Sequence, residues 1–139
     1  MTFNTTLSPG LFWLILTTLC TALMWVPYIL DRFVRSGVGA TLGFGKDIEI
    51  VQSKWAWRAK AAHANAVENL VIFATAVLVT RAMEAGSPQV ALACEVYFVA
   101  RMMHYVVYTL GLPLLRTVCF LVGCAAQVFI LGNLLFHAA

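Results

Sequence analysis

Four long apolar segments constrain the fold of this chain more than any other feature. The first, residues 11–30, contains no charged side chain over its whole length. A helix of about 20 such residues crosses a bilayer core of roughly 30 Å. Further apolar segments of membrane length follow at residues 61–80, 89–110 and 117–136, and the last of these also contains no charged side chain. We therefore predict an all-α integral membrane protein built as a bundle of four transmembrane helices.

Composition agrees with that class and limits the functions open to the chain. Of its 139 residues, 62% are hydrophobic and 11% are charged, whereas a soluble domain carries about a quarter charged residues. The length fits a single domain, residues 1–139. The net charge of +3 predicts membrane lipids as partners and no nucleic acid, because the excess lies in one loop. The four cysteines do not have the spacing of metal ligands, and we expect each to be a small buried apolar residue: Cys20, Cys94, Cys119 and Cys124.

The loop after the first span predicts the orientation. Six of the nine Lys and Arg residues lie in the stretch 32–60, and cytoplasmic loops are enriched in these residues. We therefore expect this loop in the cytoplasm, both termini outside, and the protein in the inner (cytoplasmic) membrane. Residues 1–10 carry no positive charge, and the apolar run after them is too long for a signal peptide. Four glycines predict an irregular, mobile loop: Gly37, Gly39, Gly43 and Gly45.

Short turns separate the last three spans. The turn-forming sequences are Gly86-Ser87-Pro88 and Gly111-Leu112-Pro113. Because loops this short join antiparallel neighbours, the turn before Arg116 is expected on the same membrane face as the first loop.

Polar side chains enter the second span on one side. Arg58, Asn65 and Glu68 are offset by seven and ten residues, which places them on one helical face at about 100° per residue. A charge at a helix centre costs about 2.5–3.5 kcal/mol on insertion scales. Glu68 therefore needs a partner, which we expect to be Arg101, a ligand or a proton.

The third span carries a polar column of its own. Arg101, His104, Tyr105 and Tyr108 recur at helical spacing, and Arg116 opens the fourth helix at the same level. Such a cluster of cations and donors suits a small anionic ligand with several carboxylates.

Each feature also has a structural interpretation. Arg32 and Arg35 fit membrane-edge anchors, and Arg116 fits a side chain that snorkels to the interface. Glu68 and Arg101 fit an ion pair within the bundle. The convergence of these groups at one depth favours a binding site.

The motifs in these helices resemble those of the MAPEG family, the membrane-associated proteins in eicosanoid and glutathione metabolism, in a bacterial-type form. The family's second-helix motif is Arg-x-x-Arg-Ala-x-x-Asn-x-x-Glu, and this chain reads RAKAAHANAVE at residues 58–68. The resemblance extends to Arg101-Met102-Met103-His104, to Tyr108 and to Leu115-Arg116-Thr117. It covers nearly the whole chain.

This resemblance implies a homotrimer that binds glutathione between neighbouring subunits. Family enzymes conjugate glutathione to lipophilic electrophiles, reduce lipid peroxides or isomerise an endoperoxide. By position, Asn65 and Glu68 would hold the glutathione backbone, and Arg116 would be the catalytic residue facing the thiol. Arg32 or Arg35 would reach in from the next subunit. The other implied glutathione-binding positions are Arg58, Arg101, His104, Tyr108 and Thr117.

The implied chemistry is a stabilised thiolate. The thiolate is the nucleophile, and lowering a thiol pKa by two units from about 8.5 requires roughly 2.7 kcal/mol of differential interaction. Arg suits this role because it stays charged in an apolar site. The lipophilic substrate would enter from the bilayer.

Two other functions are consistent with the sequence. The second Arg of the family motif is Ala61 here, which favours a non-catalytic lipid-binding or scaffolding member resembling the lipoxygenase-activating branch. A haem-binding membrane cytochrome would use His63 and His104, although these two histidines have no ligand spacing.

Overall fold

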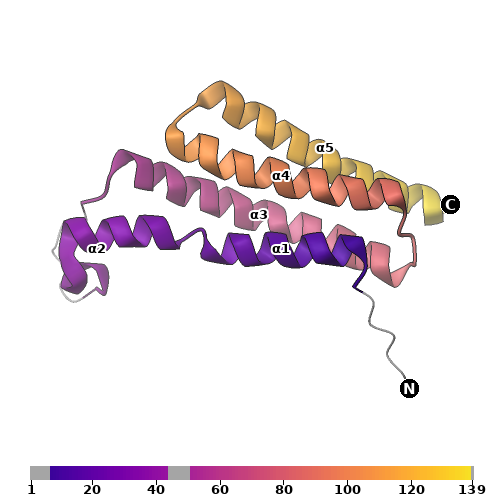
Figure 1. Ribbon diagram of the computed structural model, residues 1–139, viewed down its shortest axis with the longest axis horizontal. Coiled ribbons are helices and arrows are strands. Elements are labelled where there is room, and N and C mark those ends of the chain that lie inside the picture. The colour runs from indigo at the N-terminus through magenta and orange to yellow at the C-terminus, as the bar shows by residue number, and fades with distance from the viewer. Residues whose placement is uncertain (1–6, 44–50, 139) are drawn as a thin grey trace, which may run out of the picture.

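The computed structural model describes residues 7–43 and 51–138, and the secondary structure in these ranges is entirely helical (Figure 1). Four segments are long and apolar enough to cross a membrane, which confirms the predicted fold class. Two residues of the first loop on which predictions were based, Gly45 and the basic residue Lys46, lie outside the described ranges. The helices are α1 (Pro9–Leu23), α2 (Val26–Thr41), α3 (Lys54–Ala82), α4 (Pro88–Leu110) and α5 (Pro113–Ala138).

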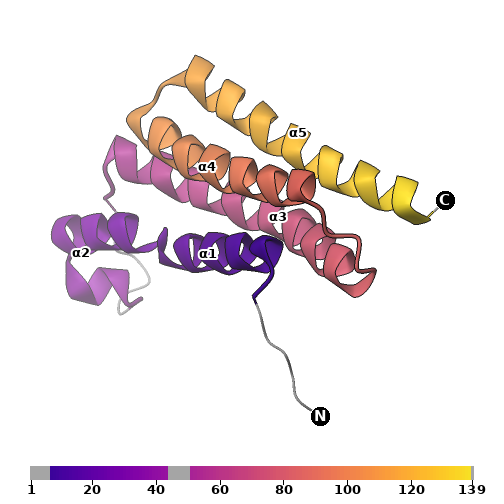
Figure 2. The same ribbon diagram turned by 45° about the vertical axis from the view of Figure 1, so that its right-hand side comes forward.

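The helices form an elongated bundle with two distinct ends. Helix α1 packs against α3 and α4, and α5 packs against α4 and α3 on the other side (Figures 1 and 2). One end contains α2, the start of α3 and the α4–α5 turn. The other end contains the start of α1, the α3–α4 connection and the end of α5. Short connections make α3, α4 and α5 antiparallel in sequence order, as expected.

The first predicted span is two helices with a break between them. Helix α1 ends at Leu23, and α2 begins at Val26. Pro27 follows at once and has no N–H to bond back to the preceding turn, which favours a break here. The Tyr105 hydroxyl donates to the Met24 carbonyl at 2.9 Å, so a side chain of α4 satisfies a backbone acceptor at the break.

The prediction of an irregular first loop was wrong for residues 31–41. This stretch is helical and belongs to α2, with one non-helical residue, Gly37, at φ +79°. This φ value favours glycine. Beyond the undescribed residues, the chain is held to α2, because Ser53 donates both its backbone N–H and its hydroxyl to Asp31.

The packed centre of the bundle is small and aromatic. Phe73 of α3 is fully buried and stacks on Tyr97 of α4, with ring centroids 3.9 Å apart. Residues from four helices complete this cluster: Leu14, Val77, Cys94 and Ile130. Large apolar side chains cover much of the remaining surface, as expected for helices that face lipid.

Candidate functional site

A cleft lies between α4 and α5 near the turn that joins them. Gly111 ends α4 at φ +81°, a left-handed conformation that glycine adopts without steric cost. Helix α5 begins two residues later, so its first turns run back along the end of α4. The cleft has a volume of about 260 Å³. Its lining residues are Asn65, His104, Tyr108, Arg116, Thr117 and Phe120.

The predicted column on α4 forms one wall of this cleft. His104 is 3% exposed and meets the Tyr108 ring edge-on at 5.5 Å between centroids. The Arg116 guanidinium lies over the Tyr108 ring at 4.5 Å, within the range of a cation–π contact. The sequence therefore correctly predicted that His104, Tyr108 and Arg116 lie close together, although these residues come from two helices.

Arg101 lies behind the cleft and holds Asn65. Its side chain is 2% exposed, and Nη2 donates to the Asn65 side-chain oxygen at 2.6 Å and to the Asn65 carbonyl at 3.1 Å. Its Nε and Nη1 atoms have no partner among the described residues. Gly123 of α5 makes room, because a Cβ there would lie 3.2 Å from Arg101 Cδ.

Of the three partners considered for Glu68, Arg101 does not pair with it, because the one ion pair among the described residues joins Arg35 to Asp31. Glu68 and Ala61 are exposed on the outer side of α3, whereas Asn65 is half-buried in the cleft. The helical offset of 60° between positions 65 and 68 is enough to turn the carboxylate away from α4. Glu68 therefore has no ion-pair partner among residues 7–43 and 51–138.

Arg58 also lies outside the cleft. Its Nε donates to the Thr109 carbonyl at 2.9 Å, and its guanidinium lies beside Gly111. Orphan carbonyls at a helix C-terminus are commonly satisfied by basic side chains. Arg58 thus caps the end of α4 and holds the α4–α5 turn against α3.

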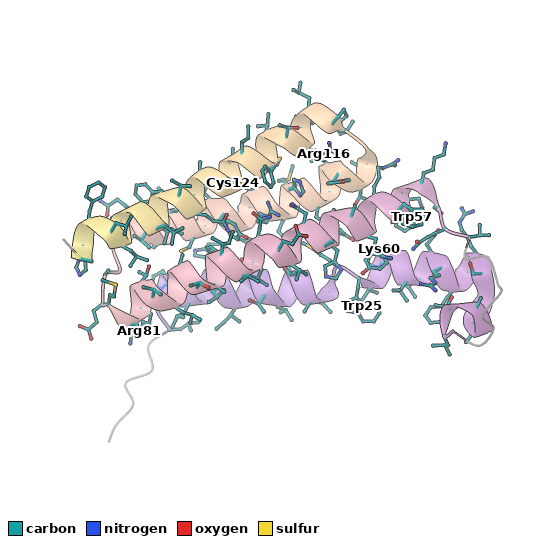
Figure 3. All side chains as sticks on the ribbon, turned by 180° about the vertical axis from the view of Figure 1, so that it is seen from behind. Trp25, Trp57, Lys60, Arg81, Arg116 and Cys124 are labelled. Atoms are coloured by element: carbon teal, nitrogen blue, oxygen red, sulfur yellow. The ribbon has the colours of Figure 1, made fainter. Side chains whose placement is uncertain are left out.

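The two arginines of α2 are separate from the cleft within one chain. Arg35 is exposed and bonds to Asp31 at 3.1 Å, whereas Arg32 is half-buried with its Nε atom lacking a partner among the described residues. Thr117 is at the cleft, where its hydroxyl donates to the Pro113 carbonyl at 3.0 Å. Figure 3 shows Arg116 at the same end of the bundle as Trp57 and Lys60.

The family is decided by comparison with known proteins. A sequence model of the MAPEG family matches residues 11–136, nearly the whole chain. The chain belongs to the MAPEG family. Membership includes glutathione-dependent transferases and peroxidases. Neither the curated proteins nor the solved structures contain a match to this chain.

Two features of this MAPEG protein differ from expectation at the site. Tyr105 was placed in the polar column, yet its hydroxyl contacts the α1–α2 break. His63 bonds to the Tyr28 hydroxyl at 2.9 Å on α2, whereas His104 lies next to Phe120 of α5. The two imidazoles thus contact different helices within one chain.

Sequence reasoning did not assign two aromatic residues of this MAPEG protein to the site. Phe120 lines the cleft, and its ring lies 5.8 Å from the Arg101 guanidinium. Tyr97 lies 6.0 Å from the same guanidinium. The spacing of Tyr97 was a usable signal, since it precedes Arg101 by four residues and shares its helical face. Phe120 also follows Arg116 by four residues on α5.

Proposed function

We propose that this MAPEG protein binds glutathione and acts as a membrane transferase or peroxidase on lipophilic electrophiles or lipid hydroperoxides. The observation that carries this proposal is the set of donors gathered at the cleft. Arg116 is cationic, and none of the lining residues is acidic. Glutathione carries two carboxylates and a thiol that ionises, and these anionic groups suit a cleft that is lined by donors and by no acidic residue.

Asn65 contributes to that set through its orientation. Arg101 occupies the side-chain oxygen of Asn65, which leaves the amide NH₂ group to donate to a ligand. The Tyr108 hydroxyl and the His104 ring are further candidate donors. Arg101 is thus a positioning residue in this proposal, and it adds positive charge behind the cleft without entering it.

Arg116 is the residue we assign to stabilising an anion. Bound glutathione supplies the thiol, whose thiolate is the nucleophile. The Tyr108 ring fixes the guanidinium at the cleft, and an exposed cation–π contact of this kind contributes about 0.5–1 kcal/mol. Half-burial of Arg116 reduces its screening by water relative to a fully exposed cation. The lipophilic substrate would approach from the bilayer side of α5.

A homotrimer is the second part of the proposal. Glu68 is exposed on the apolar outer side of α3, where contact with lipid would be costly. A neighbouring copy would cover it, and the exposed small residue Ala61 would allow close approach. In this assembly Glu68 and either Arg32 or Arg35 would complete the glutathione site, with Arg58 supporting the turn beside it. We place these groups on the cytoplasmic face, with both termini outside.

One observation favours a non-catalytic, lipid-binding role instead. Ala61 stands where the family motif has an Arg, and the neighbouring exposed cation, Lys60, lies about 100° around the helix from it. In that case the protein would bind lipid or a partner through the same cleft but would not retain glutathione.

Glutathione binding to detergent-purified protein, measured by calorimetry, tests the proposal. Glu68→Ala should lose binding, and Arg116→Gln should abolish the ultraviolet absorbance of bound thiolate while leaving the oligomer mass unchanged. Lys60→Gln is a matched control, because it removes one positive charge at the same end of the bundle but outside the cleft. Saturable binding lost in Glu68→Ala supports the site. No binding at millimolar glutathione would favour the lipid-binding role, and equal thiolate absorbance in Arg116→Gln would refute the role of Arg116.

A further inference from the structure

A second and larger cavity lies at the end of the bundle opposite the cleft. Its volume is about 920 Å³, within the range of roughly 300–1,000 Å³ typical of small-molecule sites. The start of α1, the end of α3 and the first two turns of α4 form its walls. Figure 3 shows Arg81, one of its lining residues, at the end of the bundle opposite Arg116.

The inner walls of this cavity are apolar. Val77 and Val90 are buried, and Cys94 at its base is fully buried. Trp13 forms a side wall and is supported by Phe98, with ring centroids 5.4 Å apart. A ligand in this cavity therefore needs an apolar portion of substantial size.

The mouth carries charges of both signs. Arg81, Glu84 and Glu95 line the cavity and are all exposed. None of the three forms an ion pair within residues 7–43 and 51–138. The three side chains together carry one net negative charge, and the indole ring of Trp13 lines the same cavity.

These charges discriminate between classes of amphiphile. A purely anionic lipid would meet two carboxylates and one guanidinium, which is unfavourable. An ammonium group suits Glu84 and Glu95, and the face of Trp13 attracts cations as well. A phosphate suits Arg81 and the nearby N-terminus of α4. The combination of ammonium, phosphate and apolar chain describes a zwitterionic phospholipid.

We propose that this cavity is a binding site for a zwitterionic phospholipid, with its acyl chain against Val77 and Val90 and its head group among Arg81, Glu84 and Glu95. This site is independent of the proposed glutathione site. Cys94 and His104 are ten residues apart on α4, which corresponds to about 15 Å along the helix axis at 1.5 Å per residue.

Fluorescence quenching of Trp13 tests the site. In a variant with Trp25→Phe, Trp55→Phe and Trp57→Phe, Trp13 is the remaining tryptophan. Phosphatidylethanolamine with brominated acyl chains is titrated into this protein in detergent micelles, and brominated phosphatidylglycerol is titrated in parallel. We expect saturable quenching by the first lipid and about tenfold weaker binding of the second, a difference of about 1.4 kcal/mol.

Two further variants separate head-group recognition from cavity filling. Glu84→Gln combined with Glu95→Gln should remove the preference between the two lipids, and Ala91→Phe should block quenching by both by filling the cavity. Lys60→Gln is the control, since it removes one charge at the other end of the bundle and should leave lipid quenching unchanged. Equal quenching by both lipids in the parent protein would overturn the proposal, as would a preference that survives the double substitution. The proposal would also be overturned if lipid caused no quenching because a second copy of the chain occupies the cavity. Cross-linking between copies through a cysteine placed at position 84 would detect such a contact.

Discussion

Gly123 and Gly132 of α5 offer a matched pair of substitutions that tests how Arg101 is held. Both glycines lie inside the same helix. A Cβ added at Gly132 meets nothing within 4 Å, whereas a Cβ at Gly123 lies 3.2 Å from Arg101 Cδ and 3.9 Å from the Ala100 Cβ. Arg101 cannot move aside freely, because it is buried and bonded twice to Asn65.

The structure sets the sign and size of the two effects. Replacing a helical Gly by Ala stabilises a helix by roughly 0.5–1 kcal/mol, which is the change expected for Gly132→Ala. At Gly123 the same gain is opposed by overpacking, which costs about 1–3 kcal/mol. The free energies of unfolding of the two variants should therefore differ by about 1–3 kcal/mol, with Gly123→Ala the less stable.

The assay is unfolding of each variant in mixed micelles with increasing dodecyl sulfate, followed by circular dichroism. Gly123→Ala should also weaken glutathione binding if Arg101 orients Asn65, and Gly132→Ala should not. Equal stabilisation by the two substitutions would refute the close packing of Arg101 against α5. That stability result holds whatever ligand the cleft binds.

Two further stability predictions follow from buried polar groups. Asp31→Asn should destabilise the protein by about 1.5–3 kcal/mol, because Ser53 donates to both carboxylate oxygens and the amide replaces one of these acceptors by a donor. Arg35→Gln is its control and should cost at most about 1 kcal/mol, since it removes only a surface ion pair; similar losses for both would contradict the role of Asp31. Tyr97→Phe should be neutral or stabilising by about 1 kcal/mol, because the Tyr97 hydroxyl is buried without a partner among the described residues. A clear loss of stability in Tyr97→Phe, measured by the same unfolding assay, would indicate that this hydroxyl is bonded.

Much of the candidate site could be predicted from spacing within single helices. The intervals between Arg101, His104 and Tyr108 place these residues on one side of α4, and the structure keeps them there. Arg116 was also placed correctly, because a short turn must return α5 to the level where α4 ends. Tyr105 was the exception on α4. Its hydroxyl donates to the Met24 carbonyl, which is available because α1 and α2 are separated by a break.

Contacts between helices were harder to predict than faces on one helix. Glu68 and Arg101 lie at similar depth, but α3 is rotated so that its carboxylate faces outward and Asn65 faces Arg101. Arg58 was assigned to a ligand, and the contact that the structure adds is its cap on the end of α4. A long flexible side chain can reach several partners, and its choice depends on where the end of the neighbouring helix lies.

Four membrane-length helical segments, and the end of the bundle at which polar side chains gather, could be predicted from the amino-acid sequence. Lipid requires long apolar runs, and helical periodicity assigns each residue to a face, so both follow from local sequence. The rotation of each helix about its axis depends on tertiary packing, which paired Arg101 with Asn65 and left Glu68 outside. That rotation follows from the packing of all the helices together, through contacts such as Phe73 on Tyr97 and Gly123 against Arg101. The same packing opened the cavity at the far end, which no local pattern in the sequence indicates.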